Sequence, residues 1–219
     1  GADINADPPT SDGGETALQL ATRSSNYDLI TSLVTHGGNI NSPRSCLRTA
    51  ISLENLYLVE FLLELGADAN SQNRQDGETV LQTALSSGNT KLVRLLLSAG
   101  AVLNVQSPTL GMTDLQAALL SENIELAQMV MRSGADINES TPEFQETPLE
   151  TAASSGSAEL VSVLTESIAT VCQQSLTAAL NVAVVNGYTP VVRLLLELGA
   201  NIDIKAMELE LLYKAIHSR

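Results

Sequence analysis

The chain has 219 residues, of which 25 are Asp or Glu and 11 are Lys or Arg, and its formal net charge at pH 7 is −14. Four Tyr, two Phe and no Trp are too few aromatic residues for a core or a ligand pocket built from large rings. A hydrophobic share of 44% excludes an acidic disordered tail. The negative charge argues against partners that are nucleic acids or anionic membranes, because both require clustered Lys and Arg.

The cysteines and histidines do not follow a metal or disulfide pattern. Cys46 and Cys172 form no CxxC pair, and His36 and His217 lie far apart in sequence. We therefore expect no disulfide framework, no metal site and no cofactor. No apolar stretch approaches the roughly 20 residues of a membrane span, so direct membrane insertion is not expected. The composition predicts a reduced, intracellular protein, cytoplasmic or nuclear.

Two short strings recur along the chain, with a spacing of 34 residues at its centre. The first is GADxN or a near copy, and it begins at Gly1, Gly37, Gly66, Gly100, Gly134 and Gly199. The second has Thr or Ser, then Leu two residues later, and begins at Thr16, Ser45, Thr79, Thr113 and Thr147. A fixed period of this length predicts a repeat architecture.

Each repeat predicts two short helices. The Thr of the second string is followed three residues later by Gln or Glu in four copies, which is a capping box for a first helix. A polar turn such as residues 87–89 (SGN) then leads into a second helix with apolar triplets, among them residues 61–63, and we expect Phe61 in a core position. The glycine of GADxN suits the end of this helix. Two helices this short have only marginal stability in isolation, so the repeats must stack to bury their apolar faces.

These residues resemble the ankyrin repeat family, whose repeat of about 33 residues carries the motif T-P-L-H-x-A. Residues 147–152 (TPLETA) differ from that motif at one position, and the resemblance covers nearly the whole chain. The tetratricopeptide repeat has a similar period, but its W-x-x-L-G-x-x-Y pattern is missing. The resemblance implies an all-α fold, an elongated and curved α-solenoid of stacked helix-turn-helix units joined by β-hairpin-like fingers.

The register predicts one ankyrin repeat domain over residues 1–219. Its repeats, numbered 1 to 6, span approximately 6–41, 42–70, 71–104, 105–138, 139–171 and 172–203, with partial repeats at 1–5 and 204–219. The partial ends suggest a piece of a longer array.

Three positions depart from the regular repeat. A spacing of 31 residues from Leu149 to Leu180 predicts a shortened finger before repeat 6. Residues 168–171 lack the glycine, which predicts a kink or twist there. Arg48 occupies a position where the other repeats have Gln, Glu or Asn.

No catalytic constellation is present in the sequence, and we expect no enzyme. Glu146 and Glu150 could face one another at a helix start, but such a pair is typical of a solvated cap. The resemblance implies a protein-protein interaction module whose partner contacts the concave face, made of finger tips and first helices. The partner-binding candidates are Asp76, Glu78, Leu110, Met112, Leu120, Glu143, Phe144 and Glu146.

The apolar candidates on repeats 4 and 5 are the most informative, because clustered apolar groups rimmed by acids mark interaction sites. The alternative is that Phe144 and Leu110 fold over the finger and pack against its base. Residues 95–192 contain ten acids and one base, Arg132. We therefore expect a basic, partly apolar protein or peptide partner. Alternatively, the acids only keep a Leu-rich stack in solution.

Two other functions stay open. One is a small-molecule or catalytic groove in the same face, and the other is a spacer or scaffold segment of a larger protein. The oligomeric state is left open.

Overall fold

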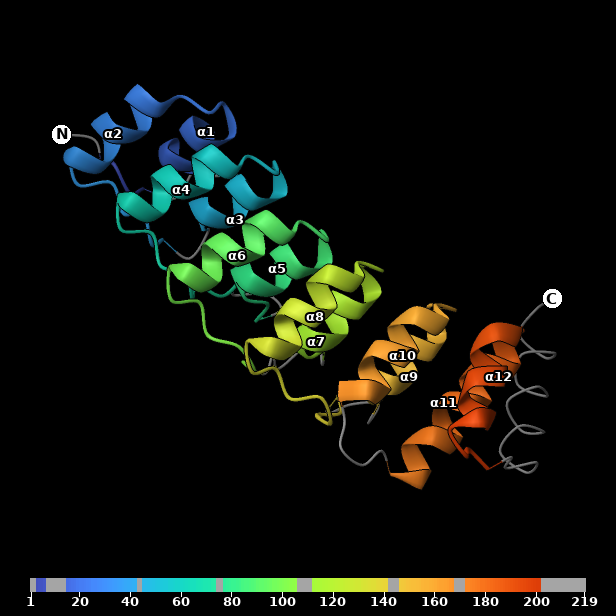
Figure 1. The fold of residues 1–219 in the computed structure, drawn as a ribbon. Coiled ribbons are helices and arrows are strands. Elements are labelled where there is room, and N and C mark those ends of the chain that lie inside the picture. Colours follow the sequence, from blue (N-terminus) through green and yellow to red (C-terminus); the bar gives the residue numbers. More distant parts are fainter. Residues whose placement is uncertain are drawn as a thin grey trace. The chain divides into compact units, whose positions relative to one another are not determined.

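The computed structural model describes residues 3–6, 15–42, 45–73, 77–105, 112–141, 146–167 and 172–201. These residues contain twelve helices, arranged in pairs, and no strand (Figure 1). They divide into two compact bodies, one within residues 1–110 and the other within residues 111–219. We call them the N-terminal body and the C-terminal body and describe each by itself.

Each body is a stack of helix pairs. The N-terminal body contains α1 (Ala17–Arg23), α2 (Tyr27–Thr35), α3 (Cys46–Ser52), α4 (Leu56–Glu64), α5 (Val80–Ser86) and α6 (Thr90–Ser98). Its first helices α1, α3 and α5 contact one another in order, and α4 contacts α6. The C-terminal body contains α7 (Asp114–Leu120), α8 (Ile124–Arg132), α9 (Pro148–Ser154), α10 (Ala158–Ser167), α11 (Gln173–Asn186) and α12 (Thr189–Glu197). There α9 contacts both α7 and α11, and α10 contacts both α8 and α12.

The predicted capping boxes are confirmed at all four positions. In α1, α5, α7 and α9 the Thr hydroxyl accepts from the backbone N–H three residues later, and the Gln or Glu side chain accepts in return from the Thr N–H. The second helices α2, α4, α6 and α8 are capped by an Asn side chain. Every one of these short helices therefore has a side-chain acceptor for one of its first-turn N–H groups.

The core consists of aliphatic side chains of modest size. Leu81, Leu92 and Leu96 are at most 1% exposed, and Ala84 lies fully buried beside them. Phe61 does not belong to this core, and the expectation of a core position is wrong. Its side chain is partly exposed on the outer surface of α4, where the buried positions are Leu58, Val59 and Leu62.

The Asn of GADxN joins one repeat to the next. The Asn70 side-chain amide donates to the Gly100 carbonyl at 3.1 Å, and its oxygen accepts from the Val102 N–H at 2.8 Å. Asn5 and Asn41 make the same pair of hydrogen bonds to the glycine turns that follow them. These glycines have φ near +90°, so the helix ends in a left-handed turn whose carbonyl needs an external donor. The GADxN string therefore couples neighbouring repeats.

The connection before repeat 6 is shortened as predicted, and the first helix of this repeat is longer than predicted. Here α11 begins at Gln173 and has 14 residues, whereas the first helices of repeats 1 to 5 have seven. Residues 173–178 contain no Gly or Pro, and Leu176 is buried, so the segment forms two additional helical turns. The Gln173 side chain donates to the Gly199 carbonyl at 2.9 Å, as Asn does elsewhere. The kink predicted at residues 168–171 lies outside the described residues.

The turn between the two helices of a repeat requires a left-handed residue. Gly88 and Gly156 fill this position with φ of 70° and 76°, while Ser25, Glu54 and Glu122 adopt φ of 50° to 55° there. At Gly156 a side chain is also excluded by space, because an added Cβ would lie 2.9 Å from the Tyr188 ring. Glu54 and Glu122 are exposed, and each carries the local backbone strain that a positive φ imposes on a residue with a Cβ.

Candidate functional site

Four of the eight partner-binding candidates lie in the described part of the chain. Glu78 belongs to the N-terminal body, and Met112, Leu120 and Glu146 belong to the C-terminal body. The other four, Asp76, Leu110, Glu143 and Phe144, lie outside the described residues. The alternative in which Phe144 and Leu110 cover the finger base lies outside them as well.

Glu78 is held by the preceding repeat. Arg48 of α3 forms an ion pair with the Glu78 carboxylate, and it also donates to the Glu78 backbone carbonyl and the Thr83 hydroxyl. The side chains of Arg48 and Glu78 are only 19% and 20% exposed. A carboxylate in this setting joins two repeats and offers little free charge to a partner.

Glu146 occupies the equivalent position two fingers further along, in the C-terminal body. Gln116 of α7 donates to the Glu146 carbonyl at 2.8 Å and to the Thr151 hydroxyl at 3.3 Å. The Thr151 hydroxyl also lies 3.1 Å from the Glu146 carboxylate and donates to it. Gln116 and Arg48 therefore make the same connection: each donates to the backbone carbonyl of a Glu and to the hydroxyl of a Thr in the next repeat. Arg48 adds a charge to it. Sequence reasoning missed this role, although the equal spacing of the two pairs is its signal.

Glu150 is a cap rather than a partner for Glu146. Its carboxylate accepts from the Thr147 N–H at 2.8 Å, which confirms the capping interpretation. Glu146 is oriented instead by Thr141 and Thr151. The two carboxylates therefore have separate hydrogen-bond partners, and the described atoms give them no shared acid-base geometry.

Leu120 is the most exposed of the described candidates. It ends α7 with 50% of its surface accessible, one helical turn beyond the buried Gln116. The equivalent residues in repeats 1, 2, 3 and 5 are Arg23, Ser52, Ser86 and Ser154. Met112, at the base of the preceding finger, is partly exposed. An aliphatic side chain in a position that is otherwise polar is a feature of a binding surface.

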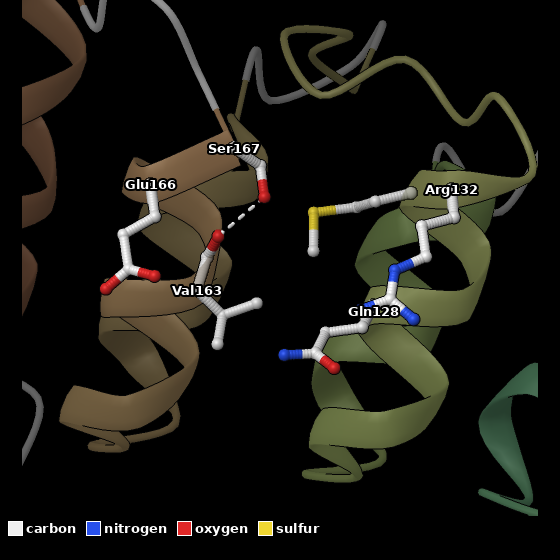
Figure 2. A pocket seen from close by; sticks show the side chains of 6 residues that line it. Gln128, Arg132, Val163, Glu166 and Ser167 are labelled. Carbon is white, nitrogen blue, oxygen red and sulfur yellow. Dashed lines mark hydrogen bonds between the residues drawn. The ribbon is translucent and has the colours of Figure 1, made fainter.

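A cavity of about 290 Å³ opens between α8 and α10, on the second helices and away from the predicted face. Gln128 and Arg132 lie on one side of it and Val163, Glu166 and Ser167 on the other (Figure 2). The Ser167 hydroxyl donates to the Val163 carbonyl at 2.8 Å. The carboxylate in this lining, Glu166, accepts from the Ser162 hydroxyl at 2.9 Å, so the described hydrogen bonds do not pair the Ser167 hydroxyl with a base.

The two cysteines are free thiols in opposite environments. Burial raises the pKa of the Cys46 thiol, because its thiolate would be removed from water. Cys172 is exposed, and hydrogen bonds from the hydroxyl and backbone N–H of Ser175 lower the pKa of its thiol. Among the described residues no group of three His, Cys, Asp or Glu is placed to hold a metal ion.

Among the described helices, none combines the length and the apolar character that crossing a membrane requires.

Comparisons with known proteins identify the repeat. A family profile described as ankyrin repeats (3 copies) matches residues 47–141 and 115–206. The ankyrin repeat domain of Bcl-3, described as a unique member of the IkappaB protein family, superposes with a TM-score of 0.72 at 26% identity, covering 86% of this chain and 88% of that one. The potassium channel AKT1 of Arabidopsis thaliana is 42% identical over 57 residues, which are 24% of this chain and 7% of the channel. Ankyrin repeats are generally protein-protein interaction modules and typically non-catalytic, and this chain belongs to the ankyrin repeat family.

Proposed function

We propose that the chain is a non-catalytic interaction module that binds a basic, partly apolar protein or peptide on the face formed by first helices and finger bases. The observation that carries the proposal is the half-exposed Leu120 at the end of α7. It stands in an acidic region, since residues 95–192 contain ten acids and one base. A partner with apolar and cationic side chains gains burial from the first feature and electrostatic attraction from the second.

The surface has a defined composition. Leu120 and Met112 supply apolar contacts, and Leu110 and Phe144 are the other apolar candidates of the sequence. Glu143 supplies negative charge in the same finger as Phe144. Glu78 and Glu146 have a different task in this proposal. Each fixes a finger base of its own body, Glu78 through Arg48 and Glu146 through Gln116.

A random peptide library selected on the immobilised chain tests the proposal. We expect the selected peptides to be enriched in Lys and Arg together with Leu or aromatic residues. Leu120→Ser and Phe144→Ala should each weaken binding of a selected peptide by about tenfold, as loss of a central apolar contact does. Val102→Ser is the matched control, because Val102 is 57% exposed but lies in the N-terminal body.

Two kinds of selected peptide would contradict the proposal. Selected peptides that are acidic, or that bind the Leu120 and Phe144 variants as tightly as the unmodified chain, would place the binding surface elsewhere. Far-ultraviolet circular dichroism on each variant confirms that the helices are intact, so that lost binding is not lost folding.

A further inference from the structure

Half of the aromatic residues of this chain gather on the outer surface of α2 and α4. Tyr27 begins α2, while Tyr57 and Phe61 are four residues apart on α4 and share one of its faces. The rings of Tyr27 and Phe61 meet edge to face, with 5.0 Å between their centroids and 70° between their planes. We call these three residues the outer aromatic cluster. It lies in the N-terminal body, on the adjacent helices α2 and α4 of Figure 1.

The rings of the outer aromatic cluster are exposed to solvent, although the packing of the repeat does not need an aromatic residue at the position of Tyr57. Tyr57 is 77% exposed and Tyr27 is 37% exposed. The residues equivalent to Tyr57 in the other repeats are Asp28, Lys91, Glu125, Glu159 and Pro190. Beneath it, Leu58, Val59 and Leu62 are fully buried and complete the core of α4. Tyr57 therefore contributes little to packing, and a large ring in water is available for a contact with another molecule.

Carboxylates accompany the rings. Glu60 and Glu64 follow Tyr57 by three and seven residues, which places them on the same side of α4 as the aromatic pair. Asp28 follows Tyr27 directly, and all three acids are exposed. Rings with adjacent carboxylates attract cations in two ways, through the negative face of the ring and through direct ion pairing.

Few basic residues of this region could neutralise those acids. Between residues 24 and 73 the sequence contains two, Arg44 and Arg48. Arg48 is held by Glu78 and Thr83, and Arg44 lies outside the described residues. On α6, which contacts α4, Lys91 and Arg94 are exposed cations, and the three exposed acids of α2 and α4 outnumber them.

We propose that the outer aromatic cluster is a second docking surface, which takes an arginine- or lysine-rich peptide segment of a partner protein. The cationic side chains lie over the rings of Tyr57 and Tyr27 and pair with Glu60, Glu64 and Asp28. Charge complementarity selects this occupant over a second copy of the chain, because two chains of net charge −14 repel each other. The proposal does not rest on the surface around Leu120, which belongs to the C-terminal body.

A fluorescent synthetic peptide of alternating Arg and Leu tests the proposal by anisotropy titration of the full chain. Tyr57→Ala should weaken binding about tenfold, as removal of an aromatic hot spot does. The double variant Glu60→Gln with Glu64→Gln should weaken it by a similar factor and reduce its dependence on salt. Val102→Ala and Glu197→Gln are matched controls, since they remove an exposed apolar side chain and the exposed charge of a second helix, α12, from other sites.

Three results overturn the proposal. The first is unchanged binding by the Tyr57 and Glu60/Glu64 variants. The second is equally tight binding of a peptide in which Gln replaces every Arg. The third is self-association of the chain, measured by sedimentation equilibrium, that Tyr57→Ala abolishes, because the occupant is then a second copy. Loss of binding in Leu120→Ser with Tyr57→Ala unaffected would assign the peptide to the other surface and would leave the proposed function standing.

Discussion

The two thiols show how position within a repeat sets the chemistry of a single residue. Cys46 is the first residue of α3 and is 1% exposed in the core of the N-terminal body. Cys172 precedes α11 and serves as its cap, so that its sulfur accepts from the first turn of a helix. Burial opposes the thiolate of Cys46, whereas the hydrogen bonds from Ser175 favour the thiolate of Cys172.

Alkylation should distinguish the two thiols. A lowered pKa means that Cys172 is more fully ionised than an ordinary thiol at any pH below its pKa, and the exposed thiolate reacts with iodoacetamide. Its rate should reach half of the maximum at a lower pH than that of a model peptide thiol. Cys46 should react about tenfold or more slowly in the native chain. Mass spectrometry of the time course measures both rates, and Ser175→Ala should move the Cys172 profile toward higher pH.

The outcome that contradicts this assignment is a common rate for the two residues in the native chain. Unfolding in denaturant provides the control. There, burial and the Ser175 hydrogen bonds are both lost, and the two rates should converge.

At the scale of the element, one connection unites the first helix of a repeat with the next finger. Gln116 reaches the Glu146 carbonyl and the Thr151 hydroxyl, and Arg48 reaches the corresponding groups of Glu78 and Thr83. Arg48 adds an ion pair that is largely removed from water. The two versions allow the contribution of the charge to be separated from that of the hydrogen bonds.

Arg48→Ala should lower the free energy of unfolding by about 2 kcal/mol at neutral pH, because the largely buried Glu78 carboxylate and its backbone carbonyl both lose their donors. Arg48→Gln should recover part of this loss, since Gln serves the same position in α7. Urea unfolding monitored by circular dichroism measures both variants. The control is the double variant Arg48→Ala with Glu78→Ala, which should be less destabilised than the sum of the single changes. A purely additive cycle would contradict the connection.

The sequence predicted the elements that depend on local chemistry and missed those that depend on neighbours. The capping boxes at Thr16 and Thr79 and the glycine turns are local, and each was found where the string predicted it. The role of Arg48 depends on a finger 30 residues away, so spacing alone did not reveal it. Phe61 was assigned to the core because it belongs to an apolar triplet, although the core side of α4 is already filled by Leu58 and Leu62.

The added turns of α11 show a second limit of local reasoning. A shortened finger was predicted from the spacing of 31 residues between Leu149 and Leu180, and the connection from α10 to α11 is short. The longer helix was not predicted, although residues 173–178 have ordinary helix-forming composition and include the buried Leu176. For the candidate site, sequence position selected Leu120 correctly as an exposed side chain. It could not show that Glu78 and Glu146 have partners within the fold.

Across the whole chain, net charge is the property that acts on a partner at the longest distance. The formal charge is −14, and residues 95–192 carry ten of the acids with one base. Outer helices α2 and α4 add exposed acids in the N-terminal body. Both proposed surfaces therefore attract a basic ligand over distances longer than direct contact, and this attraction is screened by salt.

Association of a basic peptide should consequently slow as salt rises. The screening length falls from about 30 Å at about 0.01 M salt to about 8 Å at about 0.15 M, so the association rate constant should fall by about tenfold over that range. The dissociation rate constant should change less, because it reports the short-range contacts of rings and aliphatic groups. Stopped-flow fluorescence with a labelled peptide measures both constants. A peptide in which Gln replaces Arg is the control, and an association rate that does not respond to salt would remove electrostatic steering from both proposals.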